Sequence, residues 1–180
     1  MLRLRPYKPS DAKEIISWCK DETTFRKWTS DRYETYPITA EDMNKKYIDN
    51  NGDCTEEDNF YPMIAFDEDG MVGHLIMRYT DKEKLTLRLG FVIIDDSKRG
   101  KGYGKEMISL ALKYAFEIFK AEKVTLGAFE NNGSAYYCYK SAGFEDADVE
   151  PIFYNIFGEN WKILELEITK ENYLRRCKNE

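Results

Sequence analysis

The spacing of apolar residues changes along the chain from a helical period to an alternating period and back again. After an extended start at Leu2–Arg5, spacings of three and four residues predict helices over the ranges 11–19, 23–28 and 39–49. Ser10 is expected to be the N-cap of the first helix, and Thr39 with Asp42 resembles a capping box for the third. The first third of the chain is therefore predicted to be mostly helical.

The middle of the chain alternates with a period of two, which is typical of strands. Two runs, Tyr61–Phe66 and Met71–Tyr79, are joined by an acidic turn that ends in glycine, and they predict a hairpin. A third strand is predicted over Leu85–Ile94, with one face formed by Leu85, Leu87, Leu89, Phe91 and Ile93. From Gly102 to Lys120 the period becomes helical again.

The last part of the chain returns to strands. Lys123–Phe129 predicts a strand, and Ser134–Ala142 predicts a helix that ends at a glycine. Phe153–Phe157 and Trp161–Ile168 predict a terminal hairpin, after which Thr169 is expected to cap a short helix. A meander followed by a strand–helix–strand unit indicates a mixed α/β sheet.

Composition limits the class of protein. The 180 residues include 27 basic and 33 acidic side chains, for a net charge of −6. This length suits a single domain over residues 1–180, and the acidic balance argues against a nucleic-acid partner. No apolar run is long enough to cross a membrane, and Met1–Pro6 lacks the apolar stretch of a signal peptide, so a soluble cytoplasmic protein is predicted. One histidine, His74, and four scattered cysteines give no metal-ligand pattern, and free thiols are expected.

The segment from Val92 to Lys105 runs from a strand through a glycine-rich turn into a helix. Glycines leave the backbone open to a ligand, and the free N–H groups at a helix start favour an anion. Positive charge is added by Arg99, Lys101 and Lys105. The glycines at positions 100, 102 and 104 fit neither the Walker A loop nor the dinucleotide fingerprint. The alternative is a turn in which the glycines serve chain geometry alone.

A more specific match comes from two motifs together. Arg99-x-x-Gly102-x-Gly104 resembles the acyl-CoA pyrophosphate loop of the GNAT family of N-acetyltransferases. After the next strand, the family's second pattern is similar in register to Asn132, Ala135, Tyr139, Gly143 and Phe144. On these motifs the chain is identified as a member of the GNAT family, and it resembles the branch of ribosomal-protein-alanine acetyltransferases.

This resemblance implies a fold and a co-substrate. The fold is a mostly antiparallel twisted sheet with one parallel, splayed strand pair, flanked by about four helices. The co-substrate is acetyl-CoA, and no metal is implied. In the family, the pantetheine arm of acetyl-CoA pairs with the backbone of a strand, and the corresponding residues here are Val92, Ile93 and Ile94. The loop that binds the pyrophosphate in the family corresponds to Arg99, Gly100, Lys101, Gly102, Tyr103 and Gly104. Asn132 corresponds to a residue that contacts acetyl-CoA at the mouth of the slot between the two splayed strands.

The resemblance also implies that Tyr139 is the general acid that protonates the leaving thiolate. A phenol, with a reference pKa of about 10, is protonated at neutral pH. The alternative for Tyr139 is a core aromatic. The general base is not evident, because residues 87–92 contain no carboxylate. Glu130 is the nearest candidate, with a solvated loop carboxylate as its alternative. His74 is expected to be a buried or edge histidine rather than the general base. Ile93 or Ile94 would offer its N–H to the oxyanion.

The acceptor is expected to be a primary amine, on a small molecule or at the N-terminus of a protein or peptide. In the family it is shaped by segments that correspond to Trp28–Pro37 and Pro151–Trp161. Acids there could steer an amine, namely Asp31, Glu34, Glu150 and Glu159. Cys138 is expected to be a core residue, and a homodimer remains open. The competing function is a non-catalytic acyl-CoA-binding module of the same fold.

Overall fold

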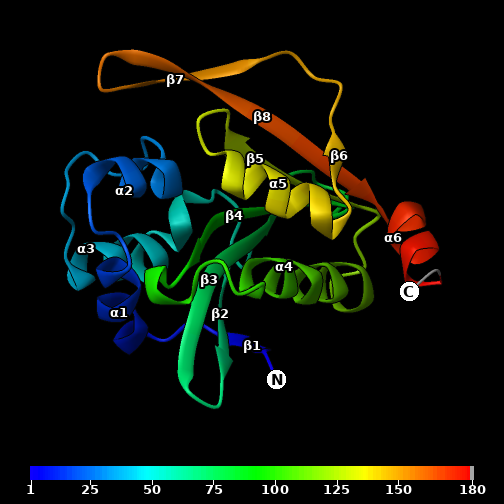
Figure 1. The fold of residues 1–180 in the computed structure, drawn as a ribbon, viewed down its shortest axis with the longest axis horizontal. Helices are drawn as coiled ribbons and strands as arrows, with labels where there is room; N and C mark the ends of the chain where they lie inside the picture. Colours follow the sequence, from blue (N-terminus) through cyan, green and yellow to red (C-terminus); the bar gives the residue numbers. More distant parts are fainter. Residues whose placement is uncertain (179–180) are drawn as a thin grey trace.

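The computed structural model describes residues 1–178, in which an eight-stranded mixed sheet runs through the molecule (Figure 1). The strand order is β1-β2-β3-β4-β5-β8-β6, with β7 paired to β8. The strands are β1 (Arg3–Pro6), β2 (Tyr61–Asp67), β3 (Gly70–Tyr79), β4 (Thr86–Ile94), β5 (Lys123–Phe129), β6 (Glu145–Asp146), β7 (Ile152–Ile156) and β8 (Glu159–Thr169). All pairs are antiparallel except β4 with β5, as the resemblance to the GNAT family implies.

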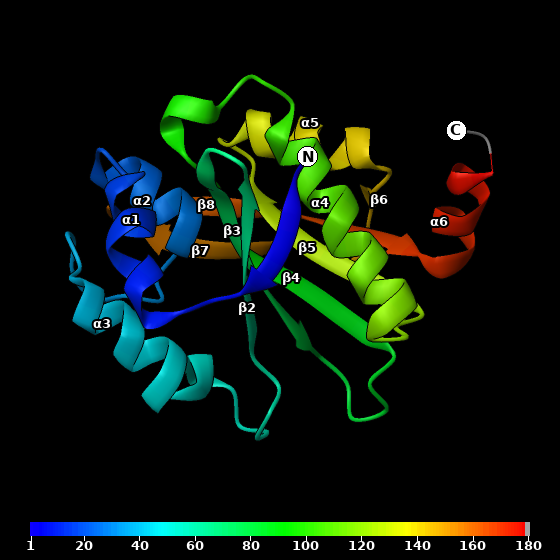
Figure 2. The same ribbon diagram turned by 90° about the horizontal axis from the view of Figure 1, so that it is seen from below.

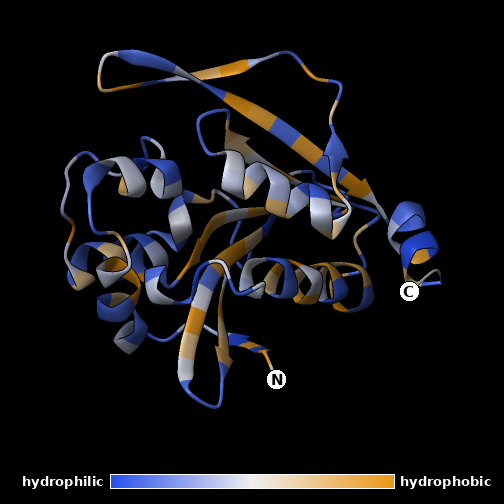
Figure 3. Ribbon diagram, viewed as in Figure 1, coloured by the Kyte–Doolittle hydropathy of each residue, from blue (hydrophilic) through white to orange (hydrophobic). Residues whose placement is uncertain are grey.

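Helices cover both faces of this sheet (Figure 2). They are α1 (Ala12–Ser17), α2 (Glu22–Thr29), α3 (Ala40–Asn44), α4 (Tyr103–Lys113), α5 (Gly133–Ala142) and α6 (Lys170–Cys177). One core packs β-strand residues such as Leu87 and Leu89 against Ile108 and Leu112 of α4. A second core, on the opposite face, joins α1, α2 and α3 to Ile64, Ile76 and Ile93. Figure 3 shows the apolar residues gathered on the central strands and on one side of α4.

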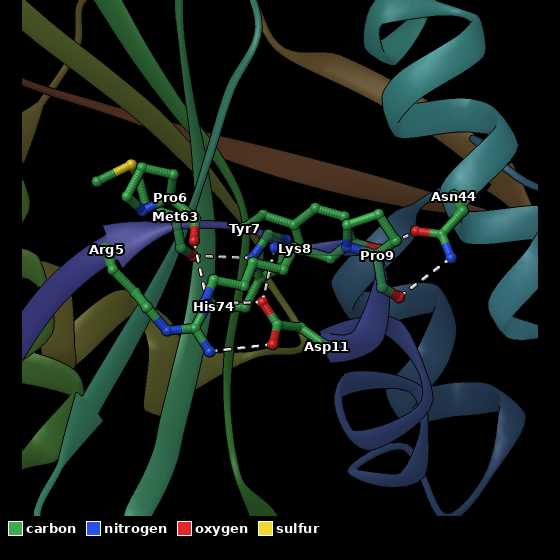
Figure 4. A network of polar contacts seen from close by, with 9 residues as sticks. All are labelled: Arg5, Pro6, Tyr7, Lys8, Pro9, Asp11, Asn44, Met63 and His74. Atoms are coloured by element: carbon green, nitrogen blue, oxygen red, sulfur yellow. Dashed lines mark hydrogen bonds and ion pairs between the residues drawn. The ribbon is translucent and has the colours of Figure 1, made fainter.

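The start of the first helix differs from the sequence prediction. Ser10 does not cap it, because the chain enters through a 3-10 turn at Pro9–Asp11. Asp11 is the last residue of this turn, and its Oδ2 accepts a hydrogen bond of 2.7 Å from the backbone N–H of Lys8, which precedes the turn (Figure 4). The same carboxylate accepts two hydrogen bonds from Arg5, at 2.7 and 3.0 Å. This bridge ties the first helix to β1.

The other predicted caps are confirmed. In α3 the Thr39 hydroxyl accepts from the Asp42 N–H, and the Asp42 carboxylate accepts from the Thr39 N–H, at 3.1 and 2.7 Å. A π-helical turn extends this helix over Lys45–Asp49. At the start of α6 the Thr169 hydroxyl accepts from Asn172 N–H. These local rules hold because each partner lies within one helical turn.

The predicted alternation along β4 is wrong beyond Leu89. The register between β3 and β4 shifts between His74 and Ile76, which leaves a β-bulge around Phe91, whose φ is +46°. A bulge adds one residue and so exchanges the two faces beyond it. Ile93 therefore packs in the second core, on the opposite side of the sheet from Leu89.

The parallel pair separates shortly after it begins. β4 and β5 pair only from Thr86–Arg88 to Lys123–Thr125, and β5 then continues along β8. The gap left between their carboxyl ends is where the cavities described below lie. Figure 1 shows the β7–β8 hairpin reaching past this gap above α2. Within residues 1–178 no helix is both long enough and apolar enough to span a membrane.

Candidate active site

A cavity of about 600 Å³ lies beside the splayed end of β4. Most of the residues expected to hold the co-substrate line it: Val92, Ile93, Ile94, Arg99, Gly100, Gly102, Gly104, Asn132 and Tyr139. Lys101 and Tyr103 belong to the same loop but not to the lining. The Tyr103 hydroxyl points to the β2–β3 hairpin, where it donates to Asp67 Oδ2 at 3.0 Å.

The lining of this cavity is strongly positive. It contains Lys27, Lys98, Arg99 and Lys105, and no acidic residue of the described chain lines it. Lys98 and Arg99 are oriented by backbone carbonyls, because Lys98 Nζ donates to Met71 O at 2.8 Å and Arg99 Nε to Ile94 O at 3.2 Å. The start of α4 adds free N–H groups and the positive end of the helix dipole.

The glycine loop leaves space for a ligand at the backbone. Gly100 and Gly102 have φ angles of +76° and +86°, a conformation that side chains disfavour. A Cβ added at either position would meet no atom within 4 Å. The open backbone, the helix start and the cations together fit a pyrophosphate, so these residues suit CoA.

Tyr139 is the buried acid candidate at the inner side of the cavity. Its side chain is 6% exposed, and within residues 1–178 its hydroxyl forms no hydrogen bond. Burial raises the pKa of this phenol well above its usual value, so it carries its proton at neutral pH. The helix that holds it begins after Asn132 and ends at Gly143, whose φ of +106° closes the helix.

Cys138 packs against the core, as expected, but it is only partly buried and also lines the cavity. Its Sγ would lie 3.1 Å from a Cβ added at Gly104, so α4 and α5 approach closely here. Burial raises the pKa of this thiol, while the positive charge of Lys105 opposes that rise.

Comparison with known proteins identifies the family. The family model described as "Acetyltransferase (GNAT) domain" matches residues 1–145. The chain belongs to the GNAT acetyltransferases. It is therefore an N-acetyltransferase that uses acetyl-CoA and transfers the acetyl group to a primary amine.

Two bacterial relatives of this GNAT acetyltransferase are named for polyamine substrates. A spermidine N(1)-acetyltransferase of Vibrio cholerae is 25% identical over 179 residues, which cover 97% of this chain and 96% of the relative. A spermine/spermidine N(1)-acetyltransferase of Bacillus subtilis is 31% identical over 108 residues, covering 55% of this chain and 71% of the relative. The finer resemblance to ribosomal-protein-alanine acetyltransferases stays a prediction.

The fold of the GNAT acetyltransferase also matches solved structures. The spermidine N-acetyltransferase of Vibrio cholerae in complex with CoA and spermine has a TM-score of 0.80 at 20% identity. That alignment covers 96% of this chain and 98% of the other. It supports the mixed sheet with one parallel pair described above.

A second cavity of about 340 Å³ lies next to the first, and Lys27 and Trp28 border both. The indole of Trp28 donates from Nε1 to the Phe91 carbonyl at 2.9 Å, which fixes the wall between the cavities. Tyr154 of the terminal hairpin and Phe129 of β5 line the far side. The two segments that the resemblance assigns to the acceptor, Trp28–Pro37 and Pro151–Trp161, contribute Trp28 and Tyr154 to this lining.

The charges in this second cavity differ from the expectation. Neither Asp31 nor Glu34, and neither Glu150 nor Glu159, lines it. The lining acids are Asp53 and Glu56, which come from the loop before β2. The lining also holds cations that sequence reasoning did not single out: Lys27, Arg32, Arg78 and Arg88. For Arg78 and Arg88 a signal was available in the sequence, because each is the one arginine in a mostly apolar strand.

His74 is buried, as predicted, and lies in the sheet rather than in either cavity. Its Nδ1 lies 2.9 Å from the Met63 carbonyl, which can only accept, so Nδ1 carries the hydrogen (Figure 4). Nε2 then accepts from the Tyr47 hydroxyl at 2.8 Å. Burial lowers the pKa of His74 to about 4, which keeps the ring neutral.

Glu130, the nearest candidate for the general base, does not line either cavity. Its carboxylate is exposed and lies 3.9 Å from Lys162 Nζ. This matches the alternative of a solvated carboxylate, and the base is left to another group or to water.

Proposed function

We propose that this chain, as one domain over residues 1–180, acetylates a primary amine of a small molecule, with Tyr139 as the general acid. The observation that carries the proposal is the junction of the two cavities. One cavity has the positive lining and open glycine backbone that suit CoA, and the other adjoins it and shares Lys27 and Trp28 with it. A cavity of about 340 Å³ suits a small amine better than a folded protein surface.

The chain's own residues would support direct transfer. The neutral amine nitrogen attacks the thioester carbonyl carbon, the C–N bond forms, and the C–S bond breaks. The departing thiolate takes a proton from the Tyr139 hydroxyl, and the excess proton on nitrogen passes to water. Water then returns a proton to Tyr139. The N–H group of Ile93 or Ile94, beyond the bulge, is the proposed donor to the carbonyl oxygen as its charge develops.

The relatives suggest where an amine screen should begin. Those cited above are named for spermine and spermidine, so these polyamines belong in the first panel. Small amino compounds of other charge belong in it as well, because the lining of the second cavity is not acidic overall.

Tyr139→Phe tests the proposed acid. The ring and its packing are kept while the donor is lost, so acetyl-CoA binding should change little. The kcat with any accepted amine should fall by roughly 10²- to 10⁴-fold, which corresponds to about 3–5 kcal/mol of barrier. The measurement is release of free CoA thiol, together with the thermal midpoint of each protein. A folded variant with the kcat of the wild type would remove Tyr139 from the mechanism.

The same assay decides between catalysis and binding alone. Amine-dependent release of CoA thiol over many turnovers supports the enzyme. If acetyl-CoA binds but no amine in a broad panel releases thiol, the chain is a non-catalytic acyl-CoA-binding module.

A further inference from the structure

Arg78 and Arg88 lie side by side on the floor of the second cavity. They are directly opposite each other in the register of β3 and β4, and both line the cavity. Like charges directly opposite on a sheet repel each other, so this pair is unfavourable unless anions neutralise it. Arg32, from the loop after α2, adds a third guanidinium to the lining.

The chain neutralises only one of these two strand arginines. Arg88 forms a bidentate pair with Glu165 of β8, with both N···O distances at 2.8 Å and side chains 27% and 13% exposed. This pair crosses β5 over Gly127, where an added Cβ would lie 3.0 Å from Glu165 Oε1 and 3.1 Å from Arg88 Nη2. Arg88 is therefore fixed in place by its carboxylate partner.

Arg78 has no such partner. It is half-buried, and within residues 1–178 it forms no ion pair and no hydrogen bond. Of the two lining acids, Asp53 is paired with Lys46, and the carboxylate of Glu56 accepts from the Thr55 hydroxyl at 3.3 Å. The charge of Glu56 reaches Arg78 only from beyond ion-pair distance. Arg78 thus presents an uncompensated positive charge to the cavity.

A second unsatisfied donor lies in the same cavity. The Ser30 hydroxyl is buried and has no hydrogen-bond partner among the described residues. Ser30 follows the last turn of α2 with φ +56° and ψ −130°, a conformation that costs energy in any residue except glycine. Buried hydroxyls are nearly always paired in folded proteins. A ligand oxygen that reached this hydroxyl would give it a partner in the same cavity that Arg78 lines.

We propose that the acceptor amine also carries an anionic group, a carboxylate or a phosphate, and that Arg78 binds this group with help from Arg32 and Ser30. The planar guanidinium suits the paired oxygens of either anion. This inference rests on the proposed function, because it takes the second cavity as the acceptor site. It also predicts a substrate different from that of the polyamine relatives. A polyamine would place further ammonium groups against the arginines, and like charges in a binding site are costly.

The test compares matched amines with the full chain and acetyl-CoA. The first arm contains amino acids and dipeptides, and the second contains amino-sugar phosphates and phosphoserine. The third arm contains the corresponding amides and unphosphorylated amines. The fourth arm contains spermidine and spermine. We expect kcat/KM to be at least 10-fold higher for a member of the first or second arm than for its neutral counterpart. The first two arms distinguish a carboxylate from a phosphate. A preference for polyamines, or equal rates for charged and neutral partners, overturns the inference.

Arg78→Met keeps the length of the side chain and removes its charge. It should raise KM for the anionic amine by roughly 10- to 100-fold while kcat, and the rate with the neutral counterpart, stay near the wild-type values. Arg78→Lys should recover part of the loss. Lys82→Met, in the exposed turn before β4, is the matched control and should change nothing. An Arg78→Met protein with an unchanged KM for the anionic amine also overturns the inference.

Failure of the proposed function would be recognised separately. If no amine supports release of CoA thiol, the same panel is measured by thermal shift with saturating CoA present. Stabilisation by anionic amines and not by their amides, lost in Arg78→Met, would retain the anion site without catalysis. No stabilisation by any anionic member would overturn the inference.

Discussion

His74 is an imidazole that the fold keeps neutral at pH values where a free histidine is charged. Its pKa is lowered by burial to about 4, from 6.5 in the unfolded chain. Between these values the unfolded chain binds a proton that the folded chain does not. Stability linked to His74 is therefore fully present above about pH 6.5 and is lost as the pH falls toward 4.

The slope of this loss can be measured. Between pH 6.5 and 4 the free energy of unfolding should fall by up to about 1.4 kcal/mol per pH unit through His74 alone. His74→Gln cannot titrate, so the difference in unfolding free energy between wild type and variant should shrink by that amount as the pH is lowered. Urea unfolding at half-unit pH steps measures it. Parallel curves for the two proteins would contradict the neutral, buried imidazole.

Cys138 reports on the occupancy of the first cavity. Because it lines the cavity that suits CoA, acetyl-CoA at saturating concentration should slow its alkylation by iodoacetamide at least 10-fold. The control is internal, since Cys177 on α6 is exposed and distant in the fold and should react at the same rate with or without acetyl-CoA. Mass spectrometry of peptides separates the two sites. Equal protection of both cysteines, or protection of neither, would show that the co-substrate does not bind beside α5.

At the scale of elements, the segment from β4 to α4 combines a strand with a β-bulge, an open glycine turn and the start of a helix. Gly102→Glu should abolish acetyl-CoA binding while the protein stays folded, because the carboxylate would occupy the open backbone and repel a pyrophosphate. Calorimetric titration with acetyl-CoA measures the effect. A folded variant with near-normal affinity would show that the loop is only a turn.

The strain of this substitution needs its own control. Gly158, in the β7–β8 turn, has φ +77° and, like Gly102, no atom within 4 Å of an added Cβ. Gly158→Glu therefore introduces the same charge and a similar backbone cost of about 1 kcal/mol outside both cavities. It should bind acetyl-CoA as the wild type does.

At the scale of the whole molecule, the charge distribution opposes the net charge. The chain carries −6 overall, yet the linings of both cavities contain more cations than acids. The excess of negative charge therefore lies outside the two cavities, and the positive lining of each cavity favours an anionic ligand. Screening by salt should weaken acetyl-CoA binding for this reason.

Binding should also stabilise the whole fold, because the first cavity joins β4, α4 and α5. At a concentration of acetyl-CoA 100 times its Kd, the free energy of unfolding should rise by about 2.7 kcal/mol. For a chain of this length that corresponds to a rise in Tm of about 5–11 °C. Differential scanning fluorimetry tests this, with Gly102→Glu as the protein that should not respond. A wild-type Tm that does not change with acetyl-CoA would show that acetyl-CoA does not bind the folded chain in preference to the unfolded chain.

The sequence by itself determined the features whose partners are close along the chain. The capping box of Thr39 and Asp42, the helix stop at Gly143 and the glycine loop before α4 depend on backbone geometry within a few residues. The motif from Asn132 to Phe144 and the loop before α4 indicated the family for the same reason, and both motifs lie along the cavity that suits CoA.

Only the tertiary structure decided the features that depend on strand register and packing. The bulge at Phe91 exists because β3 and β4 pair with a shifted register, and it reversed the predicted face of Ile93. The same register places Arg78 opposite Arg88, and the splay of β5 brings Glu165 to Arg88 alone. Such contacts join residues far apart in sequence, and their alignment follows from the packing of the whole sheet, which no local pattern encodes. The arginines are visible in the sequence, but their placement together in the second cavity is decided only by the folded chain.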